Sequence, residues 1–179
     1  MPGPLTYADY ARLPEDGPRY ELVDGALELL APAPGTLHQE ILRRLVYQFE
    51  QHCRENGKFY FAPIDVILSD TEVRQPDLVF VSNERLHIIT ERGIAGVPDL
   101  VVEILSPSTA KRDKGDKRQT YEKYGVPEYW IVDGANRLME QYRLMNGRYD
   151  FPVLFGEDDV VQSPRLTCIS FPLRLLFEN

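Results

Sequence analysis

VPDLVVEILSPST, from Val97 to Thr109, is the stretch that decides the fold. It sets one ionisable side chain, Glu103, inside a run of valine, isoleucine and leucine that is typical of a buried strand. A similar phrase, QPDLVFVS, runs from Gln75 to Ser82 and places Asp77 just before its apolar run. Because an unpaired carboxylate is costly to bury, Glu103 requires a partner, a proton or a metal ion.

The residues before these strands predict a helix, a hairpin and a longer helix. Thr6 is a suitable N-cap for a short helix over residues 7–12. YELVDGALELL predicts a β-hairpin that turns at Asp24-Gly25, a dipeptide typical of two-residue turns. Thr36 and Gln39 form a capping-box pattern, which predicts a helix from residue 36 to about residue 57.

Strands dominate the rest of the chain. KFYFAPIDVIL is expected to form one strand with a bulge or edge at Pro63, and a short helix is expected near residues 83–86. A helix over residues 111–124, a strand EYWIVD, a hairpin at Asn146-Gly147 and a final strand with an apolar helical turn follow. The pattern predicts an α/β (α+β) fold, with a mixed central β-sheet flanked by helices and an N-terminal β-hairpin. We expect a single domain over residues 1–179.

Charge and composition limit the function classes. The net charge of −8 argues against a protein that binds nucleic acid over a broad basic face. The segment AKRDKGDKRQ is locally basic, which fits either phosphate contacts or a solvated helix face. The sequence has no signal-peptide pattern and no apolar run of about 20 residues, so a cytoplasmic protein without membrane contact is expected. Cys53 and Cys168 are expected to be free thiols.

Asp77 and Glu103 are the first candidates for chemistry. If their strands pair, both carboxylates can reach one end of the sheet, where they would repel unless a proton or cation intervenes. Oxygen ligands suit Mg²⁺ or Mn²⁺. The alternative is that each carboxylate caps a strand or pairs with an arginine. Lys117 shares a helical stripe with Asp113 and Tyr121 and could reach back to Glu103, or form only a surface ion pair.

Other reactive side chains give weaker signals. His38, in the first turn of the long helix, is more often a capping or packing residue than a catalytic one. Glu21 alternates with apolar residues, as in a half-exposed strand. The histidine and cysteine spacing does not suit a zinc site, and the sequence contains neither a phosphate-binding glycine loop nor a serine-nucleophile motif.

The segments YELVDG, HQEI, QPDLVFVS, PDLVVEILSPST and RDKGDKRQTYEKYGVPEYWIVD resemble, in this order, the bacterial Uma-two family, which is assigned to the endonucleases of the PD-(D/E)XK superfamily. The resemblance extends from about Tyr7 to about Leu154. It implies a restriction-endonuclease-like core and a divalent-metal site. Asp77, Glu103 and the backbone carbonyl of Ile104 match the metal ligands, and the metal activates the water that attacks a phosphodiester.

One position departs from the superfamily pattern. The lysine expected two residues after the second acid is replaced by Leu105, and a leucine cannot polarise water. Family members with this gap place the lysine on the following helix, where Lys117 matches. Supporting roles are implied for Glu21 and His38, and expected for Asp113 and Tyr121 on the lysine's helical stripe. Phosphate contacts are expected from the other basic residues of this helix: Lys111, Arg112, Lys114 and Arg118.

Three functions therefore remain open. The first is a Mg²⁺-dependent endonuclease acting on nucleic acid, with DNA as the expected substrate. The second is a catalytically inactive nuclease-fold protein that binds a partner, which Leu105 and the acidic charge favour. The third is a metal-dependent hydrolase of a small phosphoester. A homodimer is also possible if Tyr142, Tyr149, Phe151 and Phe155 form an exposed face, although these residues could instead pack the late hairpin.

Overall fold

A mixed central sheet carries the two acidic strands. The computed structural model describes residues 3–14, 16–107 and 109–178. Within these residues the sheet has seven strands, in the order β12-β11-β10-β9-β6-β3, with β13 also paired to β11. Only β9 and β10 run parallel among its pairs. The strands are β3 (Gly57–Phe61), β6 (Leu78–Ser82), β9 (Leu100–Ile104), β10 (Glu128–Asp133), β11 (Leu138–Met145), β12 (Arg148–Tyr149) and β13 (Val153–Gly156).

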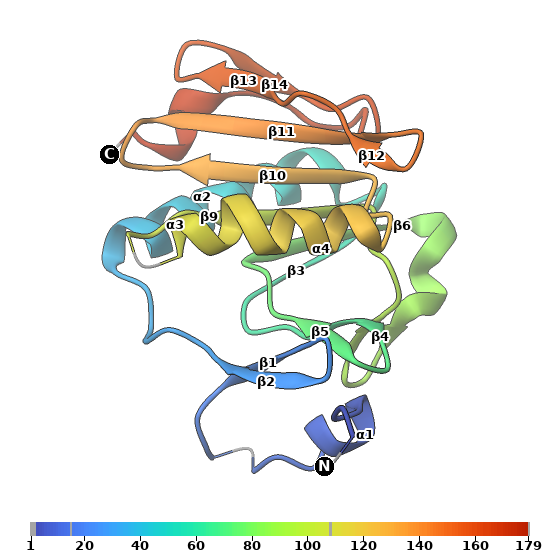
Figure 1. The fold of residues 1–179 in the computed structure, drawn as a ribbon. Helices are drawn as coiled ribbons and strands as arrows, with labels where there is room; N and C mark the ends of the chain where they lie inside the picture. The colour runs from blue at the N-terminus through green and yellow to red at the C-terminus, as the bar shows by residue number, and fades with distance from the viewer. Residues whose placement is uncertain (1–2, 15, 108, 179) are drawn as a thin grey trace.

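Helices cover the two faces of this sheet (Figure 1). Helix α2 (Thr36–Cys53) lies on one face, and a continuous helical stretch lies on the other. That stretch consists of α3 (Ala110–Arg112), a π-helical turn (Asp113–Lys117) and α4 (Arg118–Lys123). Alternate residues of β6, β9 and β10 point to opposite faces, so each strand contributes to both cores. The predicted helices and mixed sheet are therefore confirmed.

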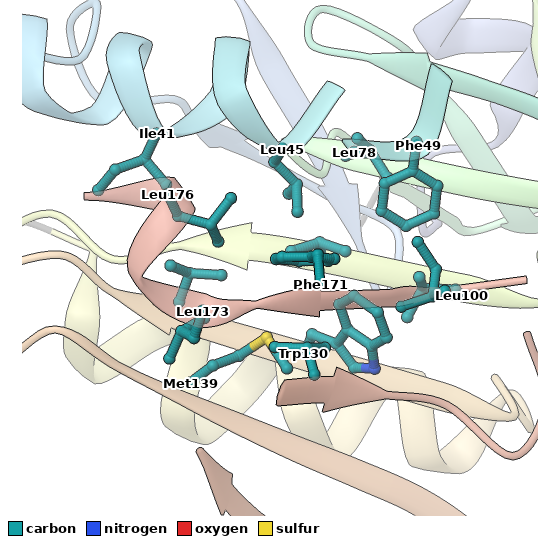
Figure 2. Packing of buried hydrophobic residues seen from close by; sticks show 14 of the residues in the cluster. Ile41, Leu45, Phe49, Leu78, Leu100, Trp130, Met139, Phe171, Leu173 and Leu176 are labelled. Carbon is teal, nitrogen blue, oxygen red and sulfur yellow. The ribbon is translucent and has the colours of Figure 1, made fainter. Parts of the chain in front are cut away.

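The core under α2 is the larger of the two and includes the end of the chain. Figure 2 shows Ile41, Leu45 and Phe49 of α2 above residues of the central sheet. The C-terminal residues fill the space between these layers: β15 (Ser170–Pro172), which pairs with β14 (Val160–Gln162), and the 3-10 turn η3 (Leu173–Leu176). The predicted final strand and apolar helical turn are confirmed.

A second, smaller sheet holds the N-terminal hairpin. Its order is β2-β1-β5-β4-β8-β7, and α1 (Tyr7–Tyr10) lies beside it (Figure 1). The strands are β1 (Tyr20–Val23), β2 (Ala26–Leu29), β4 (Val66–Ser69), β5 (Glu72–Arg74), β7 (Ile89–Thr90) and β8 (Gly93–Ala95), and η1 (Asn83–Ile88) connects β6 to β7. Asp24 and Gly25 have φ angles of 47° and 78°, as the predicted two-residue turn requires. Thr6 and Asp9 form a capping box at α1.

Two local predictions are wrong. KFYFAPIDVIL is not one strand: β3 ends at Phe61 and belongs to the central sheet, whereas β4 starts at Val66 and belongs to the small sheet. Pro63 has no N–H to donate, so strand pairing does not continue through it. The capping box at Thr36 does not form either, because Gly35 is the N-cap of α2 and Thr36 already lies within the helix.

The cysteines are not free thiols, contrary to expectation. Cys53 at the end of α2 and Cys168 form a disulfide, with their Cα atoms 5.3 Å apart. Packing of the C-terminal residues under α2 brings the two positions together, although 115 residues separate them in the sequence.

Removal of this disulfide is expected to destabilise the protein markedly. A cross-link that closes a loop of this length restricts the unfolded chain, so Cys53→Ser/Cys168→Ser should lower the free energy of unfolding by about 2–4 kcal/mol. Chemical denaturation of the oxidised protein, the reduced protein and the double variant would measure the effect. Equal stability of the oxidised and reduced proteins would contradict the prediction.

The late aromatic residues do not form the exposed face proposed for a dimer. Tyr142 and Phe155 are buried, and Tyr149 packs against the core beside Tyr129. Of the four residues only Phe151 is open, with 94% of its surface exposed. The other three pack against the core instead, as the alternative prediction held. No helix in the described part of the chain is both long and apolar enough to cross a membrane.

Candidate functional site

Strand register brings Asp77 and Glu103 together. Strands β6 and β9 are antiparallel, with Leu78 opposite Val102, so the residue before Leu78 comes opposite Glu103. Both acidic residues line one open cavity of about 590 Å³. His38, Asp113 and Lys117 line the same cavity, together with residues 30–35, 104, 106, 107 and 109. The two carboxylates predicted to meet at one end of the sheet therefore do so.

Lys117 reaches Glu103 from the helix that follows β9. Its Nζ lies 2.7 Å from Glu103 Oε1 and only 5% of the residue is exposed. The π-helical turn from Asp113 to Lys117 directs both of its end residues inward, and Tyr121 one turn later donates from its hydroxyl to the same oxygen at 3.1 Å. The helical stripe expected from the sequence is thus buried and faces the site. A lysine is present beside Glu103 although position 105 holds leucine.

Three carboxylates surround the Lys117 ammonium. Besides Glu103, its Nζ lies 3.6 Å from Glu21 Oε1 and 3.7 Å from Asp113 Oδ1. Burial tends to lower the pKa of Lys117, but the carboxylates, Glu103 foremost, raise it above the ordinary lysine value. Burial raises the pKa of Glu103 well above its usual range, which Lys117 opposes and the charges of Asp113 and Asp77 reinforce. Lys117 is therefore a cation shared by three carboxylates.

The sequence predicted that Glu21 is a half-exposed strand residue, and this prediction is wrong. Glu21 is buried beside Lys117. It has no exposed surface. Its carboxylate accepts from the Gln75 backbone N–H at 2.7 Å and pairs with Arg112 and Arg74. Burial raises its pKa, but Lys117, Arg112 and Arg74 outweigh that effect and lower it, so Glu21 stays ionised. The hairpin is in this way attached to the helix that carries Lys117.

Asp77 is held by two groups from different elements. The Ile104 backbone N–H donates to Asp77 Oδ2 at 2.7 Å, and His38 Nε2 of α2 lies 3.1 Å from the same oxygen. The other ring nitrogen of His38, Nδ1, is buried and has no hydrogen-bond partner among the described residues. His38 therefore acts on the orientation of Asp77 from the opposite side of the sheet to Lys117.

The donor set suits a hard divalent cation. Asp77 and Glu103 offer carboxylate oxygens across one cavity, and carboxylates, carbonyls and water are the ligands that Mg²⁺ and Mn²⁺ prefer. A cation there would also offset the burial of Glu103 and its repulsion by Asp113 and Asp77, which together raise its pKa. Residues 3–14, 16–107 and 109–178 contain no cluster of three or more His, Cys, Asp or Glu side chains arranged as metal ligands. A site here therefore needs backbone or water ligands besides the two carboxylates.

Comparison with known proteins shows the family and the fold of this chain. Residues 7–174 match the Uma2 family, described as "Putative restriction endonuclease". The chain belongs to the Uma2 family. The Uma2 chain is also similar to a crystal structure described as a putative nuclease belonging to DUF820 from Anabaena variabilis, with a TM-score of 0.78 and 21% sequence identity. The match covers 97% of this chain and 98% of the other, so the two share the fold. No curated protein matches the chain.

The basic helix of this Uma2 chain is partly engaged in internal contacts. Arg112 pairs with Glu21 and Glu28, and Lys114 Nζ lies 2.5 Å from Glu140 Oε1. Arg118 stacks over the Tyr142 ring at 5.5 Å, whereas Lys111 is exposed. The four residues expected to contact phosphates therefore do not form one free basic surface.

Arg74 is a site-supporting residue that sequence reasoning missed. It is 1% exposed and donates from Nε to Glu72 Oε1 at 2.6 Å and from Nη2 to Thr120 Oγ1 at 2.9 Å. Arg74 and Glu72 are two residues apart on one strand, a spacing that puts both side chains on the same side. This spacing in the sequence indicates that Glu72 and Arg74 can form an ion pair, but it does not show that the pair is buried.

The second Pro-Asp pair has a structural role. Asp99 precedes β9 and therefore lies at the opposite end of the β6–β9 pair from Asp77. It accepts from the Ser82 backbone N–H and from Arg165, both at 2.8 Å. Burial raises its pKa, but these hydrogen bonds outweigh that effect and lower the pKa below the ordinary aspartate value. Similar sequence phrases thus have different roles because the strands run in opposite directions.

Asp99→Asn is expected to lower the free energy of unfolding by about 2 kcal/mol at neutral pH, since it weakens hydrogen bonds to a charged group. Because the pKa of Asp99 is lower in the folded protein, its charge stabilises the fold at pH values above the unfolded pKa of about 3.9. This stabilisation is lost as the pH falls through the folded pKa. The difference between wild type and variant should therefore be constant above about pH 5 and shrink below about pH 4. Urea denaturation across this range measures it, and a difference independent of pH would contradict the assignment.

Proposed function

We propose that this Uma2 chain is a divalent-metal-dependent endonuclease that hydrolyses phosphodiester bonds in nucleic acid, with DNA as the expected substrate. The observation that carries the proposal is Lys117 Nζ at 2.7 Å from Glu103 Oε1, in a cavity that Asp77 also lines. Two carboxylates can hold a cation and a lysine can stabilise phosphate charge, so this set suits metal-dependent phosphodiester hydrolysis, and family membership supports the same reaction.

The chain's own residues have separable roles. Asp77, Glu103 and the Ile104 carbonyl would hold the cation. When bound there, Mg²⁺ or Mn²⁺ would neutralise phosphate charge and lower the pKa of the attacking water. Lys117 orients Glu103 and presents a buried positive charge to the phosphoryl oxygens, where the developing negative charge is stabilised most strongly. Tyr121 holds Glu103 from the same helix, while His38 and the Ile104 N–H hold Asp77.

A non-catalytic nuclease-fold binding protein is the second candidate. The observation that favours it is the engagement of Arg112 and Lys114 with carboxylates, in a chain whose net charge is −8. Such a protein would bind metal and a partner without cutting nucleic acid.

One experiment separates the two candidates. Plasmid and single-stranded DNA are incubated with wild type, Asp77→Asn and Asp99→Asn in Mg²⁺, Mn²⁺ or EDTA, and metal binding is measured by calorimetry on the same samples. Asp99→Asn is the matched control, because it makes the same change in the similar phrase outside the site. The nuclease proposal requires metal-dependent cleavage that only Asp77→Asn abolishes. Metal binding that depends on Asp77 without any cleavage would favour the binding protein.

A further inference from the structure

Two more cavities adjoin the one that contains Asp77 and Glu103. One, of about 440 Å³, lies between the β3–β4 connection and β7–β8, and the other, of about 570 Å³, lies beside α1. Arg19 and Gln75 line all three cavities. We call the two additional cavities the side groove. The three cavities are therefore neighbours at Arg19 and Gln75.

Two arginines of the side groove form no close ion pair among the described residues, although the charge of Asp65 acts on Arg19. Arg19 donates from Nε and Nη2 to Gln75 Oε1, at 3.2 and 2.8 Å, and this partner is neutral. Arg92 donates from Nη1 to the Ala11 carbonyl at 3.4 Å. Both residues are exposed, and neither forms an ion pair with a carboxylate in the described part of the chain. Each is therefore available to an anionic ligand.

The acidic residue inside the groove is already engaged. Asp65 Oδ1 accepts from the Tyr10 hydroxyl at 3.0 Å and from Gln75 Nε2 at 2.9 Å. Burial raises the pKa of Asp65, and its hydrogen bonds hold it against the groove wall. The arginines thus share the groove with one carboxylate that interacts with the protein, Asp65, and with one that is exposed, Glu91, which lines both cavities.

Tyrosine rings supply the rest of the groove. Tyr7, Tyr10 and Tyr20 line the cavity beside α1, and Tyr60 lines the other; all four are half-buried. Tyr7 and Tyr10 stack with ring centroids 6.3 Å apart, and the Tyr10 hydroxyl donates to the Tyr20 carbonyl at 3.0 Å. Positive charge interleaved with fixed aromatic rings is the arrangement that binds unpaired nucleic-acid strands, because every base can stack on a ring.

Position relates this groove to the cleavage site. Gln75 is two residues before Asp77, so their Cα atoms are at most about 7 Å apart. We propose that the side groove binds a single-stranded segment of the nucleic-acid substrate next to the phosphodiester that is cut, with Arg19 and Arg92 on phosphates and the tyrosines on bases. The position beside the cleaved bond rests on the proposed function, whereas the binding itself does not require cleavage.

The test measures binding in EDTA, where no cleavage occurs. Fluorescence anisotropy with labelled oligothymidylate and oligouridylate of about 12 nucleotides, and with a duplex of the same length, gives the affinities at several salt concentrations. Single strands should bind more tightly than the duplex. Arg19→Gln/Arg92→Gln should weaken this binding at least about tenfold. The variant should also make the negative slope of log K against log salt shallower by about 1.4, since each phosphate contact contributes about 0.7. Comparison of the two oligonucleotides separates DNA from RNA as the bound strand.

Matched controls make the result specific. Arg54→Gln/Arg148→Gln removes the same charge from two exposed positions outside the groove and should leave the affinity unchanged. Tyr60→Leu should weaken binding at least about fivefold, whereas Tyr60→Phe, which keeps the ring, should not. Equal losses in both arginine pairs, or a preference for duplex, would overturn the proposal. Groove-dependent binding by a protein that cuts nothing would support the groove and reject the nuclease, so the two failures are distinguishable.

Discussion

Lys117→Met is expected to lower the rate of metal-dependent cleavage by about 100- to 1,000-fold, the usual loss when a buried electrostatic group is removed from a reacting centre. The variant keeps most of the side-chain volume and removes the charge that lies 2.7 Å from Glu103. Single-turnover cleavage of a labelled oligonucleotide at saturating metal measures the loss. Thermal melting of the same samples shows whether the variant remains folded.

A second variant tests whether position 105 and position 117 are equivalent. Leu105 follows Glu103 by two residues, so its side chain leaves the backbone on the same side of the strand. Leu105→Lys in the Lys117→Met background would restore an ammonium beside Glu103 and should recover at least about tenfold of the lost rate. Full activity in a folded Lys117→Met variant would show that the helix lysine is not the functional one.

Arg74→Met is expected to lower the free energy of unfolding by about 3–5 kcal/mol, since it leaves the buried Glu72 without its ion-pair partner and removes one of the cations around Glu21. Arg74 pairs with Glu72 and Glu21, and all three residues are almost completely buried. Urea denaturation at pH 7 measures the change. The variant should also cleave more slowly, because Arg74 pairs with Glu21 and Glu21 contacts Lys117.

Two controls separate charge from packing at Arg74. Arg143→Met removes a half-buried arginine whose partner is the neutral Gln141, and should cost no more than about 1.5 kcal/mol. Glu72→Gln/Arg74→Met removes one of the two carboxylates as well, and should be less destabilising than Arg74→Met alone. A double variant that is no more stable than Arg74→Met would show that lost packing, and not unpaired charge, determines the cost.

Local sequence signals predicted much of the fold. The Asp24-Gly25 and Asn146-Gly147 turns adopt positive φ angles, and the apolar runs at β6, β9 and β10 form the centre of the sheet. These signals succeed because turn chemistry and the alternation of side chains along a strand depend on neighbouring residues only. The division of KFYFAPIDVIL between two sheets was not predictable in the same way, since each half pairs with a segment far away in sequence.

The site residues, too, were only partly predictable from local sequence. Glu103 was recognisable as costly to bury, and the spacing of Asp113, Lys117 and Tyr121 predicted one helical stripe. The burial of Glu21 and the participation of Arg74 were not recognisable, because both depend on the small sheet packing against the helix. Likewise, two Pro-Asp phrases look alike in the sequence, and only the antiparallel pairing of β6 with β9 separates Asp77 from Asp99.

The sequence by itself determined which residues carry charge into apolar surroundings: Asp77 just before one strand, Glu103 on the next, and Lys117 on the helix after them. The tertiary structure alone decided which of these charges meet. It placed Asp77 opposite Glu103 and joined Cys53 to Cys168 across 115 residues. It also brought the Lys117 ammonium beside Glu103, where the apolar side chain of Leu105 cannot supply a charge. The physical reason is that strand and helix propensities act over a few neighbouring residues, whereas ion pairs, register and disulfides depend on packing between distant segments.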